Sequence, residues 1–158
     1  MVLSPGTPAP SFRLARADGE SFTEQDLLGR TTVLVFYPFA FSPVCTEQLQ
    51  LYEGLLGELR APRAGAEPGE LYGVSCDSSQ AQSAFREKLG VSSEQLSDFE
   101  PKGAACAAFG VLHPGGFAQR ALVITGADGV VRWSHEADSP GDLPGVELLR
   151  EGLQTALR

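Results

Sequence analysis

Cys45 stands where a helix is expected to begin directly after a buried strand. The apolar run from Thr32 to Tyr37 predicts that strand, and Pro38 ends it because proline has no N–H to donate to a central ladder. Ser42 and Pro43 then have the pattern of a helix N-cap followed by proline at the first helical position. In that first turn, unpaired N–H groups and the helix dipole favour a negatively charged thiolate. We therefore expect a reactive nucleophile at Cys45, against the alternative of a small, inert apolar residue.

The other elements expected from the sequence surround this strand and helix. Leucines at every fourth position extend the helix from Pro43 to about Arg60. Alternating apolar residues, turn residues and helix caps predict the remaining elements. In chain order these are a hairpin at 11–15 and 21–23, a strand at 71–76, a helix that ends at Gly90, a short helix at 101–109, a hairpin at 120–125 and 130–133, and a last helix from Val146. Asp77 is interpreted as an N-cap of the helix before Gly90.

Two stretches have no clear periodicity. The segment from Ala61 to Gly69 is rich in proline and glycine, and we expect a surface loop there rather than a linker between domains. The segment from Val91 to Glu100 is polar, and neither a helix nor a strand is favoured in it. The chain of 158 residues shows no internal repeat and has the length of one domain, so residues 1–158 are predicted to fold as a single unit.

Composition excludes several classes of function. A charged fraction of 20% and an apolar fraction of 42% are typical of a globular protein, and no apolar run is long enough to cross a bilayer. The net charge of −8 argues against binding to nucleic acid or to an anionic membrane. The start of the chain lacks the basic head and apolar core of a signal peptide. Three widely spaced cysteines form neither a disulfide framework nor a zinc motif, so a cytoplasmic protein without metal or cofactor is expected.

The spacing of Pro38, Ser42 and Cys45 resembles the Pro-x-x-x-Thr/Ser-x-x-Cys signature of the peroxiredoxins. Many members of that family carry glutamate three residues after the cysteine, whereas this chain carries Gln48, which can still form hydrogen bonds. The resemblance runs from Gly6 to near the C-terminus. It is nearest the one-cysteine, alkyl hydroperoxide reductase E type or the Q type, the bacterioferritin-comigratory proteins.

The order of the expected elements is that of a thioredoxin-like α/β fold. Strand, helix, strand and helix are followed by a hairpin and a final helix, with the cysteine at the first strand-to-helix turn. We therefore predict a central mixed β-sheet flanked by helices, with an N-terminal β-hairpin. The resemblance implies a thiol-dependent peroxidase that reduces hydrogen peroxide and organic hydroperoxides through a sulfenic acid on Cys45.

The resemblance also assigns roles around Cys45. Ser42 would cap the helix and donate a hydrogen bond to the peroxide, although the cap alone explains this residue equally well. Pro38 would shield the thiolate from water, against the alternative of an ordinary turn proline. Arg120 directly precedes an apolar strand and corresponds to the active-site arginine of the family, which stabilises charge as it moves from sulfur to oxygen. The alternative for Arg120 is a solvated charge at a strand end.

The sequence leaves the regeneration of Cys45 open. Cys76, at the end of a strand expected to lie parallel to the first, is a better internal resolving cysteine than Cys106. Nothing in the first turn of the helix marks it as able to unwind for a disulfide, so a one-cysteine cycle with an external thiol is favoured. The reductant would be thioredoxin, glutaredoxin or a low-molecular-weight thiol, and the protein a monomer or homodimer. Alternatives are a redox-sensing or chaperone-like module and, less favoured because Gln48 replaces a second cysteine, a disulfide oxidoreductase.

Overall fold

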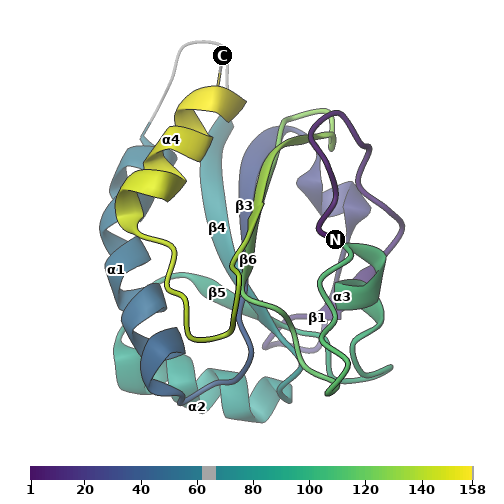
Figure 1. The fold of residues 1–158 in the computed structure, drawn as a ribbon, viewed down its shortest axis with the longest axis vertical. Coiled ribbons are helices and arrows are strands. Elements are labelled where there is room, and N and C mark those ends of the chain that lie inside the picture. The colour runs from purple at the N-terminus through teal and green to yellow at the C-terminus, as the bar shows by residue number, and fades with distance from the viewer. Residues whose placement is uncertain (62–66, 158) are drawn as a thin grey trace.

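The computed structural model of the chain describes residues 1–61 and 67–157, and its strands form one seven-stranded sheet (Figure 1). The order of strands across the sheet is β2-β1-β5-β4-β3-β6-β7. The strands are β1 (Arg13–Ala15), β2 (Ser21–Thr23), β3 (Arg30–Phe36), β4 (Glu67–Ser75), β5 (Glu94–Ser97), β6 (Ala121–Thr125) and β7 (Val131–Glu136). The helices are the 3-10 turn η1 (Glu24–Leu27), α1 (Pro43–Arg60), α2 (Ser79–Leu89), α3 (Ala104–Ala108) and α4 (Val146–Ala156).

The centre of the sheet is mixed. Strand β3 pairs in parallel with β4 and antiparallel with β6, so Phe36 at its end lies opposite both Val74 and Ala121. Consecutive residues of β3 from Thr32 to Phe36 are fully buried, because helices or loops cover both faces of this strand. The carboxyl ends of β3 and β4 consequently meet the amino end of β6 at one edge of the sheet.

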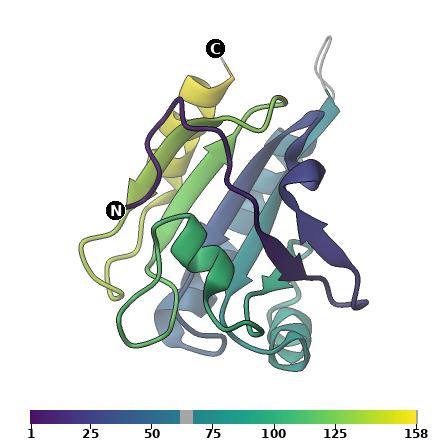
Figure 2. The same cartoon turned by 90° about the vertical axis from the view of Figure 1, so that its right-hand side faces the viewer.

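The two faces of the sheet carry different layers. Helices α1, α2 and α4 cover one face, whereas α3 and the N-terminal segment lie on the other (Figures 1 and 2). Each face has its own hydrophobic core. The α1 face contains Cys45 together with leucines of α1 and α4, and the α3 face contains Cys76 and Cys106. The three thiols are therefore divided between the two cores.

The predicted mixed sheet with flanking helices and an N-terminal hairpin is confirmed, and α1 has the predicted bounds. Three expectations need correction. The polar stretch from Val91 to Glu100 contains β5, which pairs with β4 and is largely buried. Of the loop expected from Ala61 to Gly69, residues 62–66 lie outside the described part, and β4 already begins at Glu67. Ser78, not Asp77, caps α2, because the Ser78 hydroxyl accepts the N–H of Ala81.

Within residues 1–61 and 67–157, none of the helices combines the length and the apolar character that a bilayer span requires.

Close packing of α4 on β7 provides a test of the fold. A Cβ atom added to Gly152 of α4 would lie 2.5 Å from Cε3 of Trp133 on β7, and a rigid indole ring cannot move aside at low cost. We expect Gly152→Ala to lower the free energy of unfolding by about 1–3 kcal/mol, the usual effect of overpacking. Urea denaturation measures this change.

The control for this prediction is Gly57→Ala in α1, where an added Cβ has nothing within 4 Å. At this exposed site alanine should stabilise the helix by about 0.5–1 kcal/mol because it is the better helix former. Equal effects of the two substitutions would contradict the packing seen between α4 and β7.

Candidate active site

The chain turns sharply between β3 and α1 and places Cys45 in the first turn of the helix. Tyr37 still bonds to the neighbouring strand through its N–H, which donates to the Val74 carbonyl at 3.0 Å, and the ladder ends at Pro38. The Ser42 hydroxyl accepts the N–H of Cys45 at 3.2 Å, so Ser42 is the N-cap that the sequence predicted. The side chain of Cys45 is fully buried at this point.

A second contact anchors the turn from the end of β4. The carboxylate of Asp77 accepts the N–H of Ala40 at 2.8 Å and the hydroxyl of Ser75 at 2.7 Å. Phe41 adopts a left-handed conformation with φ of 69°, which is uncommon for a large side chain, and its ring packs on Phe85 of α2 at 5.1 Å. Asp77 therefore stabilises the turn that leads into α1, and it does not cap α2.

Arg120, the residue directly before β6, contacts Cys45 with its side chain. Its Nη2 group donates to Cys45 Sγ at 3.2 Å, its Nη1 group to Gln48 Oε1 at 2.6 Å, and its Nε group to the Pro140 carbonyl at 2.8 Å. Only 2% of Arg120 is exposed. In residues 1–61 and 67–157 no carboxylate forms an ion pair with Arg120. A buried positive charge needs hydrogen-bond acceptors, and the sulfur of Cys45 is one of the three that Arg120 has.

Gln48 and Tyr52 extend this arrangement along α1. Gln48 donates through Nε2 to the Tyr52 hydroxyl at 3.4 Å, and Tyr52 donates to the Pro144 carbonyl at 2.6 Å. Burial raises the pKa of Tyr52, which keeps its phenol protonated and able to donate. The sequence marked Gln48 as a departure from a family pattern that can still form hydrogen bonds. It predicted a loop before the last helix, but it gave no sign that Tyr52 and this loop would take part in the site. The helical spacing of residues 45, 48 and 52 is the signal that could have indicated one shared face.

Pro38 lines an open pocket whose other lining residues include Phe39, Cys76, Asp77 and Lys102. Cys45 is not among the residues that line this pocket, and its side chain is fully buried.

The structure does not join Cys76 to Cys45. Instead, Cys76 Sγ lies 4.0 Å from Cys106 Sγ in the core of the α3 face. A carboxylate oxygen of Asp98 and both sulfurs lie within 4.8 Å of one another, a grouping that the wide spacing of these residues in the sequence did not predict. The two oxygens of Asp98 also accept the N–H groups of Ala105 and Cys106, at 3.0 and 2.8 Å. Asp98 therefore anchors α3.

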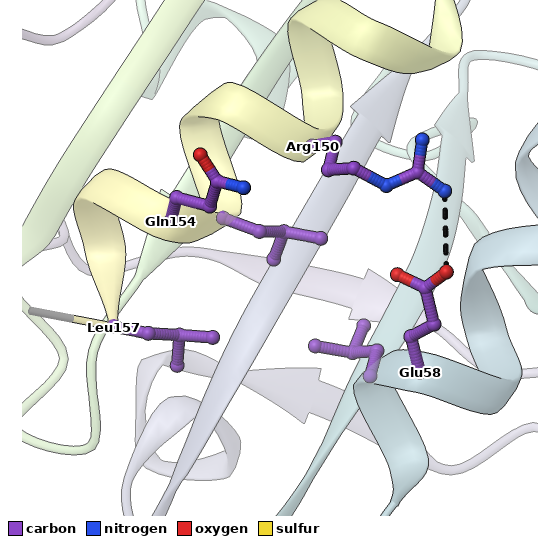
Figure 3. Close-up of a pocket in the computed structure, with 6 residues that line it drawn as sticks. Glu58, Arg150, Gln154 and Leu157 are labelled. Carbon is purple, nitrogen blue, oxygen red and sulfur yellow. Dashed lines mark hydrogen bonds and ion pairs between the residues drawn. The ribbon is translucent and has the colours of Figure 1, made fainter.

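A groove lies between α1 and α4 (Figure 3), and no cysteine is among its lining residues. Its polar lining includes Glu58 and Arg150, which form an ion pair at 3.2 Å. About 20 Å of helix separates Glu58 from Cys45 at the rise of 1.5 Å per residue. The groove presents no nucleophile, and we assign it no part in the chemistry at Cys45.

The contact between Gln48 and Arg120 should be measurable as stability. Gln48→Leu leaves the buried Nη1 group of Arg120 without its acceptor, which should lower the free energy of unfolding by about 1–3 kcal/mol. Gln50→Leu on the exposed side of the same helix makes the same chemical change and should stay within about 0.5 kcal/mol. Urea denaturation compares the two variants. If both lose a similar amount of unfolding free energy, the contact between Gln48 and Arg120 contributes little to stability.

Known proteins share both the sequence pattern and this architecture. Residues 5–134 match the model of the AhpC/TSA family. Peroxiredoxin Bcp of Escherichia coli K12 is 31% identical to this chain over 91% of its length and 85% of the relative. Alkyl hydroperoxide reductase E of Mycobacterium bovis is 27% identical over 96% and 97% of the two chains.

Solved structures agree with these relatives. The crystal structure of Enterococcus faecalis AhpC superposes with a TM-score of 0.84 at 25% identity, covering 99% of this chain and 93% of that one. The family match spans most of the chain, including the strand, turn and helix that hold Cys45 and the strand that follows Arg120. The chain belongs to the AhpC/TSA family: it is a peroxiredoxin, a thiol-dependent peroxidase.

Proposed function

We propose that Cys45 is the peroxidatic residue and that Arg120 activates it. The observation that carries this proposal is the 3.2 Å contact between Arg120 Nη2 and Cys45 Sγ in a buried site. The thiolate attacks the nearer oxygen of a hydroperoxide, the O–O bond breaks, and the other oxygen leaves as water or an alcohol after protonation. Negative charge moves from sulfur to oxygen during this step, and a fixed guanidinium beside the sulfur can follow that charge.

Ser42 and Pro38 complete the proposed site. The Ser42 hydroxyl accepts the N–H of Cys45, and its own proton can be donated to a bound peroxide one helical turn from the sulfur. Pro38 lines the open pocket, whereas Cys45 is fully buried. This arrangement supports a role for Pro38 in keeping bulk water away from the sulfenic acid.

The burial of Cys45 supports a small substrate. Cys45 is fully buried, while Phe39 and Phe41 in the turn before α1 are about half exposed, at 49% and 48%. Hydrogen peroxide and short organic hydroperoxides could reach the sulfur after small movements of this turn. The exposed rings would favour an apolar substituent on the peroxide.

We propose a one-cysteine cycle for the return of Cys45 to the thiol. Cys45 belongs to the core on the α1 face, and Cys76 contacts Cys106 in the core on the α3 face. This division favours an external thiol that attacks the sulfenic acid, such as thioredoxin, glutaredoxin or a low-molecular-weight thiol. A chain with three free, widely spaced cysteines suits the reducing cytoplasm, and it would act as a monomer or homodimer.

Two substitutions test the chemistry. Cys45→Ser should abolish peroxide consumption in the presence of excess dithiol. Arg120→Met should slow the single-turnover formation of the sulfenic acid by roughly a hundredfold, the usual cost of losing one preorganised donor. The matched control is Arg132→Met on β7, because Arg132 is exposed and pairs with Asp128. A change of only a few-fold in Arg120→Met, with circular dichroism unchanged, would remove Arg120 from the mechanism.

The same assay separates an enzyme from a redox sensor. Steady consumption of peroxide with a small thiol or thioredoxin is expected of the enzyme, whereas a sensor would need its partner protein for each turnover. Under the proposed cycle, one equivalent of peroxide should leave a sulfenic acid on Cys45 that dimedone traps in most molecules. A peptide map dominated by a Cys45–Cys76 disulfide would instead show that Cys76 resolves the intermediate.

A further inference from the structure

Cys76 and Cys106 form a pair of thiols outside the site just described. Cys76 directly follows β4, Cys106 lies in α3, and their sulfurs are 4.0 Å apart although the residues are distant in sequence. Both lie in the core of the α3 face, whereas Cys45 lies in the core of the α1 face. The proposed cycle at Cys45 uses neither of them.

The two thiols of this pair are not equivalent. The two sulfurs lie within hydrogen-bonding distance, and either thiol can be the donor. With Cys106 as the donor, this bond lowers the pKa of Cys76. The same bond, together with burial, raises the pKa of Cys106. Burial of Cys76 and the carboxylates of Asp98 and Asp77 oppose this lowering, whereas Lys102 adds to it. Cys76 is thus the member suited to be a nucleophile, and Cys106 the member that keeps its proton.

Solvent exposure also favours Cys76 over Cys106 as the nucleophile. Cys76 is 6% exposed and lines the open pocket with Phe39, Phe99 and Lys102. Cys106 is fully buried behind it. A small oxidant in this pocket is therefore placed to contact Cys76, whereas Cys106 has no exposed surface.

The contacts of Asp98 favour a dithiol over a metal site. Asp98 could act as a third ligand by position, but each of its oxygens accepts a backbone N–H at the start of α3. Binding a metal through Asp98 would compete with those bonds. Closing a disulfide requires the two sulfurs to approach from 4.0 Å to about 2 Å, and it leaves the bonds of Asp98 to α3 in place.

We propose that Cys76 and Cys106 are a second redox-active site, which closes to an intramolecular disulfide when a hydroperoxide oxidises it, independently of Cys45. The Cys76 thiolate attacks the peroxide oxygen, the O–O bond breaks, and water or an alcohol leaves, so that Cys76 becomes a sulfenic acid. Cys106 then attacks the Cys76 sulfur, the S–O bond breaks, and the hydroxyl group leaves with the Cys106 proton as water. The peroxide is reduced by two electrons, and the two thiols are oxidised to one disulfide.

The test uses the full-length Cys45→Ser variant, so that its outcome is independent of turnover at Cys45. The variant is exposed to hydrogen peroxide at pH 7, quenched with N-ethylmaleimide, and analysed by intact mass and by a non-reducing peptide map. We expect a Cys76–Cys106 linked peptide, formed about tenfold faster than in the same chain unfolded in urea. The reaction is expected to be faster in the folded protein because a thiol in the unfolded chain is only a few per cent thiolate at this pH, and the thiolate is the form that attacks the peroxide. The linked peptide is also expected in the wild type.

The order of reaction is tested by a second variant, Cys45→Ser with Cys106→Ser. Without Cys106, the sulfenic acid on Cys76 has no resolving thiol and should appear as a dimedone adduct. Cys45→Ser with Cys76→Ser should leave Cys106 reduced, since Cys106 is fully buried.

Three results would overturn the proposal. The first is alkylation of both thiols by N-ethylmaleimide after an exposure that oxidises the urea-unfolded chain. The second is disulfide formation no faster in the folded protein than in urea. The third is one equivalent of zinc that copurifies with Cys45→Ser, is lost in Cys76→Ser, and protects both thiols from peroxide. Any of these results would leave the peroxidase chemistry of Cys45 as it stands.

Discussion

The buried guanidinium of Arg120 is the constraint on which the site depends. With only 2% of the residue exposed, its positive charge is costly unless every donor has an acceptor and the charge has a partner. Gln48 and the Pro140 carbonyl satisfy two of its groups, and the third points at the sulfur of Cys45. The buried cation is costly for stability, but it provides a fixed positive electrostatic potential at the sulfur of Cys45.

The pairing of β3 with β6 determines where the Arg120 guanidinium lies. Phe36, the last residue of β3, pairs with Ala121, the first residue of β6. Arg120 precedes Ala121, so it lies beside the start of the turn that leads from β3 to α1. The Ser42 cap brings Cys45 back over this edge, and Asp77 fixes the turn from the end of β4. Three strand ends and one helix start thus converge, which is where α/β sheets generally hold their reactive groups.

The sheet also separates the thiols chemically. On the α1 face, Cys45 has a cation as its partner, whereas on the α3 face Cys76 has another thiol. A sulfur beside a fixed charge suits repeated attack on a peroxide. Two sulfurs in contact suit closure to a disulfide, because the resolving thiol is already in place. One chain therefore holds two different environments for cysteine, set by the face of the sheet on which each lies.

Local sequence determined the elements that depend on neighbours along the chain. The apolar run before Pro38, the Ser42–Pro43 cap and the leucine spacing predicted the end of β3 and both bounds of α1, because strand burial, capping and helix periodicity are local. Strand β5 was missed because its polar residues are satisfied by partners elsewhere: Gln95 accepts the Tyr37 hydroxyl. The contacts of Arg120, the bond from Tyr52 to Pro144 and the pairing of Cys76 with Cys106 join residues far apart in sequence. Only the tertiary structure decided those contacts. The pairing of strands and the packing of helices on the sheet bring such residues together, and neither can be inferred from the spacing of residues along the chain.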